Sequence, residues 1–325
     1  MIMITMNATR IPLALLLVLS APAAAQAPAP PTTEAQAAAL KELIASSPRS
    51  QRKAMPLEIQ VPSPDWNTDY ISSTVSAKDG TVYVLHRNLK FDPIVAIDRK
   101  GVILRSWGKG LYENPHSIRL DQEGNVWTVD SRSSVVLKFT PQGKQLLRFE
   151  IGEIPAGGTR GAADITFAPG GRIFIADGYG NARILEYDGQ GRRVNQWGSA
   201  GTGPGQFHLP HGLTYLNGMI YVADRQNGRI QWFTLEGKYV GEWNHLGKTF
   251  SITAAPDGNL WISTHPRNVV NEAPGWVVNV ERATGKILSY IESPGLHSAH
   301  ADSAGNVLSD PGRGNLNRVV WFRNF

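Results

Sequence analysis

One turn glycine recurs at a regular interval along most of the chain. Six glycines follow one another at separations of 44, 47, 47, 40 and 47 residues: Gly80, Gly124, Gly171, Gly218, Gly258 and Gly305. Short runs that alternate apolar and polar residues flank most of them, as in TVYVLH, NVWTVD and MIYVAD, and further runs such as ARILEYD and VNQWG follow. Their period, length and content of Val, Ile, Tyr and Trp predict strands. Six units of four short antiparallel strands predict an all-β fold, a six-bladed β-propeller.

The last unit is short of one strand, which predicts how the ring closes. After its third run, NLNRVVWFRNF, the sequence ends at Phe325. A run without a unit of its own, LEIQV at Leu57–Val61, precedes the first blade. We expect this segment to supply the fourth strand of the last blade, which leaves few open sheet edges. The propeller would then be a single domain over residues 56–325.

The first 55 residues have a different composition. Residues 1–25 combine Arg10, the apolar run IPLALLLVLS and three alanines, which are the three regions of a secretory signal peptide. The apolar run is too short for a membrane span. Residues 26–55 form an Ala- and Pro-rich leader, in which KELIASS is expected to be a short helix. We therefore expect a secreted or periplasmic monomer without a membrane span.

The absence of cysteine and the modest charge exclude several kinds of site. With 0 cysteines, the chain has neither a disulfide nor a thiolate nucleophile. Its net charge is +5, and the basic residues are spread through the repeats without a cluster interleaved with aromatic residues. Nucleic acid is therefore not expected as a partner, whereas a small anionic substrate is compatible with this charge.

Three histidines occupy one position of the repeat, in every second unit. His116 and His297 precede their turn glycine by eight residues, and His211 precedes its glycine by seven. In a ring of six blades these positions lie about 120° apart, near the axis. A single histidine on a strand is more often structural, but three in threefold register favour a metal site. Three imidazoles with an open position are typical of catalytic Zn²⁺, although iron, copper, nickel and cobalt bind the same nitrogens.

The equivalent position in the other three units carries no histidine. It falls at about Ser72, Ala163 and Phe250. His300 comes three residues after His297, so on a regular strand its side chain is expected to face away from the triad.

Two arginines and a tyrosine are expected on the same rim as the histidines. The start of the first strand and the end of the second lie at the same end of a blade, because the two strands are antiparallel. Arg87 and Arg225 follow the second strand of units one and four, and Tyr179 follows Gly178 in unit three. Two guanidinium groups beside a metal suit a carboxylate substrate. The alternative is that each arginine pairs with a neighbouring aspartate.

Two other recurrences are expected to be structural. Aspartates that end the second strand occur in units with and without histidine, and we expect them to bond turn amides: Asp130, Asp177, Asp224 and Asp310. Tryptophans near the ends of blades are expected to pack between blades: Trp107, Trp197 and Trp243.

Three segments between Ile175 and Phe233 carry a resemblance to a known family. They read IADGYGNARILEYDGQGRRVNQWG, GPGQFHLPHGL and VADRQNGRIQWF. In order and spacing they are similar to the DGY-NSRI, PGQF–PHSL and ADRENGRIQ-F elements of the peptidyl-α-hydroxyglycine α-amidating lyases, within the wider class of NHL-repeat propellers. The resemblance covers residues 70–325. It implies zinc ligands at His116, His211 and His297, a catalytic tyrosine at Tyr179, and active-site arginines at Arg87 and Arg225.

The activity that the resemblance implies is that of a metal-dependent lyase. Its substrate would be a peptidyl- or N-acyl-α-hydroxyglycine, R–CO–NH–CH(OH)–COO⁻, which is cleaved to the amide and glyoxylate. Tyr179 would act as general base, and Arg87 and Arg225 would orient the C-terminal carboxylate. The structural calcium of the family is in question, because Ser298 stands where the family has an aspartate after the third histidine.

Two other functions are compatible with a propeller of this kind. An NHL-repeat binding module without catalytic activity would bind a protein or glycan at its rim. A propeller hydrolase or lactonase would hold calcium at the axis through acidic ligands, whereas the axial candidates here are histidines.

Overall fold

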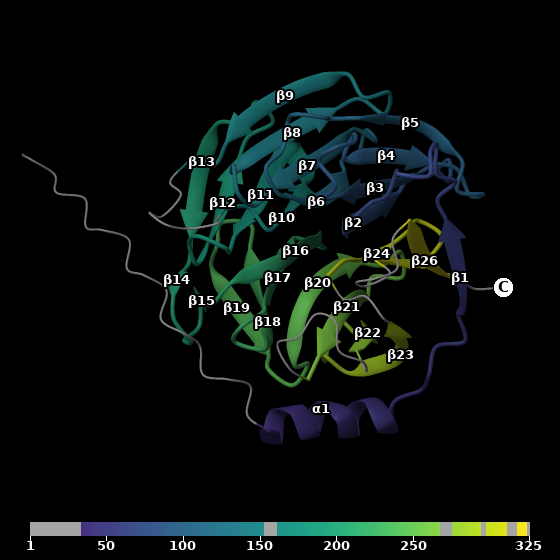
Figure 1. Cartoon of the computed structure of the whole chain (residues 1–325). Coiled ribbons are helices and arrows are strands. Elements are labelled where there is room, and N and C mark those ends of the chain that lie inside the picture. Colours follow the sequence, from purple (N-terminus) through teal and green to yellow (C-terminus); the bar gives the residue numbers. More distant parts are fainter. Residues whose placement is uncertain (1–33, 153–160, 267–274, 294–296, 311–316, 324–325) are drawn as a thin grey trace, which may run out of the picture.

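The computed structural model describes residues 34–152, 161–266, 275–293, 297–310 and 317–323. Within these ranges, six four-stranded antiparallel sheets surround a central axis as the blades of a propeller (Figure 1). The predicted all-β fold with six repeated units is confirmed.

In five of the blades the four strands follow one another along the chain. Blade one contains β2 (Ile71–Ser76), β3 (Val82–His86), β4 (Ile94–Ile97) and β5 (Ile103–Trp107). Blade two contains β6 (Pro115–Leu120), β7 (Val126–Asp130), β8 (Val135–Phe139) and β9 (Gln145–Glu150). Blade three contains β10 (Asp164–Ala168), β11 (Arg172–Asp177), β12 (Arg183–Tyr187) and β13 (Arg193–Trp197).

Blades four and five continue the same pattern. Blade four contains β16 (Pro210–Leu216), β17 (Met219–Asp224), β18 (Arg229–Thr234) and β19 (Tyr239–Trp243). Blade five contains β20 (Lys248–Ala254), β21 (Leu260–His265), β22 (Gly275–Val280) and β23 (Ile287–Ser293). A short parallel pair, β14 (Ser199–Ala200) and β15 (Gln206–Phe207), connects blades three and four, and a 3-10 turn, η1 (Pro169–Gly171), joins β10 to β11.

Blade six joins both ends of the described chain. It contains β24 (Ala299–Ala301), β25 (Val307–Ser309), β26 (Arg318–Arg323) and, as its outer strand, β1 (Lys53–Glu58). An N-terminal strand therefore closes the ring, but it lies earlier than the predicted Leu57–Val61. Beyond Glu58 the backbone leaves the sheet, because the Ile59 amide donates to the Asn317 carbonyl and the Gln60 amide donates to the Gly101 carbonyl. Most side chains of β1 are exposed, so its pairing rests on backbone bonds that no hydrophobic pattern reveals.

The turn between the first and second strands of each blade requires glycine. The six glycines that defined the repeat adopt φ angles between 72° and 91°. In this left-handed region a side chain is strained, whereas glycine is not. The recurrence in the sequence is therefore a recurrence of one hairpin turn.

The core consists of apolar clusters between neighbouring blades. Six such clusters are present among the described residues, one at each contact between two blades. The recurring tryptophans take part as predicted: an added Cβ on Gly143, Gly237 or Gly285 would meet the indole of the preceding blade at 2.6–3.0 Å. These indoles belong to Trp107, Trp197 and Trp243.

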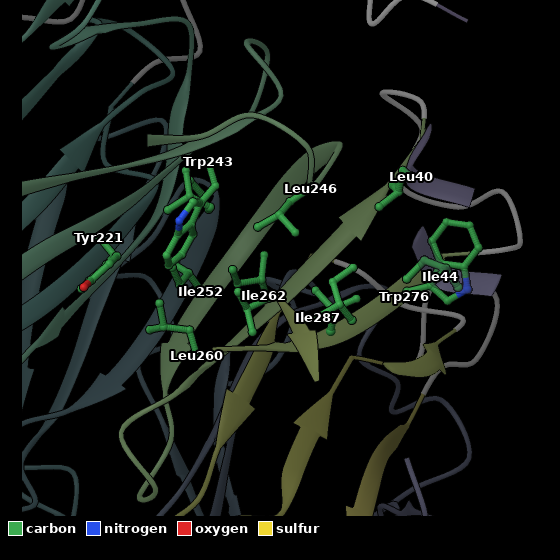
Figure 2. Packing of buried hydrophobic residues seen from close by; sticks show 14 residues of the cluster. Leu40, Ile44, Tyr221, Trp243, Leu246, Ile252, Leu260, Ile262, Trp276 and Ile287 are labelled. Carbon is green, nitrogen blue, oxygen red and sulfur yellow. The ribbon is translucent and has the colours of Figure 1, made fainter. Parts of the chain in front are cut away.

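A helix precedes the propeller and covers part of blade five. Helix α1 (Glu34–Ser46) begins well before the expected KELIASS segment. Leu40 and Ile44 are spaced by one helical turn and are 0% and 5% exposed, in one cluster with Leu246 and Trp276 (Figure 2). Part of the leader is therefore packed on the propeller. No helix in the described part of the chain is long and apolar enough to cross a membrane.

Candidate metal centre

The first strand of each blade lines the channel, and an irregularity near its start shapes the site. In four blades the pairing of this strand skips one residue: Ser72, His116, His211 and Phe250. Such a bulge re-aims side chains. As a result His116 and its successor Ser117 both line the narrow part of the channel, as do Ser72 and Ser73.

The three predicted histidines converge on the axis from alternate blades. The ligand-capable nitrogens of His116, His211 and His297 all lie within 4.8 Å of one another. The side chains are buried, with 2%, 3% and 8% of the residue surface exposed. This convergence is the geometry of a possible metal site.

The other nitrogen of each ring is fixed by the neighbouring blade. Nδ1 lies 2.6 Å from the Ala163 carbonyl oxygen in His116, 2.6 Å from that of Phe250 in His211, and 2.7 Å from that of Ser72 in His297. Because a carbonyl only accepts, each Nδ1 carries the proton and donates. Each Nε2 therefore presents a lone pair, which is the tautomer that binds a metal.

The protonation state of the rings follows from their surroundings. Burial lowers the pKa of His116 and of His211 well below the usual value, and the proximity of the other imidazoles and of the rim arginines lowers both further. Burial, followed by the Arg87 charge, lowers the pKa of His297 to about 3. The three imidazoles are neutral at physiological pH, as metal ligands must be.

A cation at the centre fits this arrangement. Nε2 of His116 and Nε2 of His297 lie 3.1 Å apart, although both are acceptors in the tautomer that the carbonyls impose. Two lone pairs at this distance repel each other unless a positive species lies between them. The donor set, three neutral imidazoles, suits Zn²⁺.

Tyr179 lies directly over the histidines. Its hydroxyl oxygen is 3.0 Å from Nε2 of His116 and 2.9 Å from Nε2 of His211. Gly178 makes this placement possible, because a Cβ at that position would come within 1.9 Å of the Pro210 carbonyl oxygen. The loop that carries the tyrosine therefore lies tightly against blade four, beside His211.

The two predicted arginines flank the histidines on the same rim. Arg225 Nη1 lies 3.5 Å from the Tyr179 hydroxyl, and its guanidinium lies over the rings of Tyr179 and Phe250 at 5.8 and 5.3 Å. Arg87 Nε donates to the Pro115 carbonyl at 3.3 Å. Within the described residues neither guanidinium has a carboxylate within ion-pair distance, so the alternative that each pairs with an aspartate is not observed.

Two further residues at the rim were not identified from the sequence. The Arg87 guanidinium lies over the Tyr70 ring at 4.8 Å, and this ring meets His297 edge to face at 5.7 Å. Lys248 is buried and donates to the Gln226 carbonyl, and burial lowers its pKa. The two residues stand at equivalent positions of units one and five, but their residue types differ, so no recurring residue marked this position in the sequence.

The recurring aspartates serve the framework. Asp130 accepts the backbone amides of Glu113 and Asn114 through one oxygen and those of Arg132 and Ser133 through the other. Asp224 likewise accepts the His208 amide and forms a 2.8 Å ion pair with Arg229. The prediction that these carboxylates bond turn amides is confirmed for both.

A second ring of polar residues lies against the histidines in the channel, and we call it the axial polar layer. Its members each follow directly in sequence a histidine of the triad or the residue equivalent to it in another blade: Ser73, Ser117, Asp164, Ser251 and Ser298. Calcium does not fit this layer. Ca²⁺ takes six to eight oxygen ligands with carboxylates among them. Asp164 is the one carboxylate in the axial polar layer, and its two oxygens already accept four hydrogen bonds. The space that remains between these side chains is about 10 Å³.

His300 faces away from the triad, as expected. It lines a cavity of about 250 Å³ further along the first strands, together with Arg119, Thr166 and Thr214. Burial, followed by the Arg119 charge, lowers the pKa of His300 to about 3.

Fold and site together define a six-bladed propeller with three histidines on its axis and a tyrosine and two arginines at its rim. Comparison with known proteins agrees with this class. A family model described as a six-bladed β-propeller matches residues 161–292. A virginiamycin B lyase from Staphylococcus aureus has the same fold, with a TM-score of 0.59 and 14% identity over 84% of this chain and 100% of that one.

Several sequence relatives are named as amidating enzymes, so the predicted resemblance is confirmed. The chain is 36% identical over 183 residues to the peptidyl-glycine alpha-amidating monooxygenase of Mus musculus, covering 51% of this chain and 19% of that one. It is 32% identical over 209 residues to the peptidyl-alpha-hydroxyglycine alpha-amidating lyase 1 of Drosophila melanogaster, covering 55% and 38%. The chain thus spans less than half the length of these two relatives.

Proposed function

We propose that this protein is a zinc-dependent lyase that cleaves a peptidyl- or N-acyl-α-hydroxyglycine to the corresponding amide and glyoxylate. Relatives named α-hydroxyglycine α-amidating lyases support the reaction class. The observation that carries the proposal is the position of Tyr179, whose hydroxyl is within 3.0 Å of Nε2 of both His116 and His211. A group able to transfer a proton thus lies against the ligand atoms of the candidate centre, where a non-catalytic binding module needs none.

The chain's own residues would handle the proton and the carboxylate. A Zn²⁺ ion held by His116, His211 and His297 would supply a Lewis acid for an oxygen of the substrate. Tyr179 would take the proton of the carbinol hydroxyl and deliver it to the amide nitrogen as the C–N bond breaks and the C=O bond of glyoxylate forms. No atom or charge is lost in this transfer, so no further reactant is needed.

The arginines would hold the substrate in register with the tyrosine. Arg87 and Arg225 lie on opposite blades and have no acidic partner among the described residues, so both are available for a carboxylate. Charge-assisted hydrogen bonds to such a group are the strong class of hydrogen bond. Arg225 also contacts the Tyr179 hydroxyl, which would couple carboxylate binding to proton transfer.

Export belongs to the same proposal. The signal peptide predicted for residues 1–25 lies outside the described residues. Mass spectrometry of the protein from its native host should find the mature N-terminus near Gln26, and an intact Met1 would contradict export.

The test of function is glyoxylate release from small N-acyl-α-hydroxyglycines by the zinc-loaded protein. Tyr179→Phe should lower turnover by about 10²- to 10⁴-fold, the usual contribution of one acid–base group, with unchanged zinc content. Tyr239→Phe is the matched control, since Tyr239 packs against Phe233 away from the channel. Absence of glyoxylate from all such substrates, or full activity of Tyr179→Phe, would refute the lyase assignment.

A further inference from the structure

A guanidinium group occupies the axial polar layer, and the proposed reaction does not use it. Arg119 lies on β6, and only 12% of its side chain is exposed. Its Nη1 donates to the Ser73 hydroxyl at 3.1 Å and to the Ile118 carbonyl at 2.8 Å, and its Nη2 donates to Asp164 at 2.8 Å. The cation is therefore held by oxygen atoms from three consecutive blades.

The carboxylate that faces it extends the connection to a fourth blade. Asp164 Oδ1 accepts the Ser117 hydroxyl at 2.5 Å and the Ile165 amide at 2.9 Å. Its Oδ2 accepts the Leu213 amide of blade four at 3.3 Å, besides Arg119. Removal of one partner from a buried ion pair is strongly destabilising, because it leaves a buried charge uncompensated.

Several contacts of this pair involve neighbours of the residues that hold or orient the histidines. Ser117 follows His116 in sequence, and Asp164 follows Ala163, whose carbonyl accepts the His116 Nδ1 proton. Ser73, in turn, lies 3.3 Å hydroxyl to hydroxyl from Ser298, which follows His297. A shift of Arg119 or Asp164 would therefore shift the backbone that aims the histidines.

We propose that Arg119 is a positioning residue for the three-histidine centre: its guanidinium is the built-in cation of the axial polar layer, where it makes a structural calcium ion unnecessary. The inference rests on the proposed metal centre but not on the substrate. The guanidinium satisfies the acceptors that a divalent ion would need, and Ser298 supplies a neutral hydroxyl beside it. The space left, about 10 Å³, holds at most one water.

The parent protein tests the first half of the proposal. Elemental analysis should find no stoichiometric calcium after equilibration with CaCl₂, and neither Ca²⁺ nor a calcium-selective chelator should change the melting temperature of the zinc-loaded protein. One calcium ion per chain, or a melting temperature that rises with Ca²⁺, would overturn the proposal. Neither measurement depends on glyoxylate release, so both remain interpretable even if the lyase assignment fails.

Zinc affinity tests the second half. Arg119→Met should weaken zinc binding by about 10-fold in competition with a chromophoric chelator, the lower range for groups that support metal ligands. The control is Arg172→Met, which breaks the 2.6 Å ion pair to Glu186 outside the channel and should leave zinc affinity unchanged. Unchanged affinity in folded Arg119→Met, or an equal loss in both variants, would overturn the positioning role.

A double variant separates positioning from general stability. Arg119→Ser with Ser298→Asp removes the guanidinium and adds a carboxylate to the same layer, so Ca²⁺ should now raise both the melting temperature and the zinc affinity. The single Arg119→Ser variant lacks the added carboxylate and should respond less. If Ca²⁺ affects the double variant no more than the parent, the guanidinium does not occupy a cation's place.

Discussion

Nδ1 of His116 lies 2.6 Å from the carbonyl oxygen of Ala163, the residue at the equivalent position of the next blade. The same relationship joins His211 to Phe250 and His297 to Ser72. Blades without a histidine therefore have a defined role, because their backbone selects the tautomer of the histidine beside them. The propeller works as three pairs of blades, each with one ligand and one carbonyl that orients it.

Metal binding should depend on all three ligands and should stabilise the fold. Binding to the native state alone adds about 2.7 kcal/mol when free metal exceeds its Kd 100-fold, so a chelator should lower the melting temperature. His211→Ala should lose zinc on elemental analysis and lose this response. His245→Ala, at a histidine bonded to Gly285 off the axis, is the control and should keep both. Full zinc occupancy in His211→Ala would exclude the site.

The arginines should discriminate between acid and ester substrates. Arg87→Ala should lower kcat/KM for an N-acyl-α-hydroxyglycine by about 10- to 100-fold, as expected for loss of a hydrogen bond to a charged group, mainly through KM. The methyl ester should be affected less, because it carries no charge. Arg225→Ala should lower kcat as well, since Arg225 also contacts Tyr179. Equal losses for acid and ester would show that these groups do not bind the carboxylate.

Gly178 should be as necessary for turnover as the tyrosine that follows it. A methyl group here would lie 1.9 Å from the Pro210 carbonyl oxygen, so Gly178→Ala must move the loop away from blade four. The expected result is a loss of turnover with retained zinc, because none of the three ligands lies on the loop that carries Gly178. The matched control is Gly189→Ala, because an added Cβ at Gly189 would meet its nearest atom only at 3.7 Å and the φ angle of Gly189 is not in the left-handed region. Parent-like turnover of Gly178→Ala would mean that the tyrosine loop adapts freely.

Sequence reasoning succeeded where the repeat itself carries the geometry. A position shared by six blades has a fixed place relative to the axis, so His116, His211 and His297 could be grouped before any coordinates. The same register located Arg87 and Arg225, because both follow the second strand. Tyr70 and Lys248 were not found in this way, because they share a register position but differ in residue type, so nothing recurs there.

The contacts of Arg119 and β1 show a second limit. The partner of Arg119, Asp164, lies on a neighbouring blade, and nothing in the spacing of the two residues marks them as a pair. Strand β1 was placed too late because Leu57 and Ile59 alternate like a buried strand, whereas the real pairing includes exposed residues from Lys53 onward. Side-chain patterns report burial, and backbone pairing at an outer edge leaves little trace in them.

Stability should decrease in acid partly through His86. This side chain is 0% exposed, and burial lowers its pKa to about 4 from the usual 6.5. A depressed folded-state pKa means that the unfolded chain binds the extra proton first, so this stability is complete above pH 6.5 and is lost as pH falls toward 4. The slope is about 1.4 kcal/mol per pH unit for one proton. Unfolding of zinc-free protein by urea from pH 7 to 4 should show a shallower slope for His86→Gln, and identical slopes would refute this assignment.

The N-terminal segment should contribute in two separable steps. Deletion of residues 1–50 removes α1 and uncovers the surface on which Leu40 and Ile44 pack, at a cost of about 1.5–3 kcal/mol for each buried side chain. That protein should melt earlier but remain monomeric, since β1 still pairs with β26. Deletion of residues 1–58 removes β1 as well and exposes the β26 edge, which invites pairing with another chain. Light scattering should therefore detect association only for the longer deletion. If the protein with the longer deletion stays monomeric and has the same melting temperature as the protein with the shorter deletion, β1 does not close the ring.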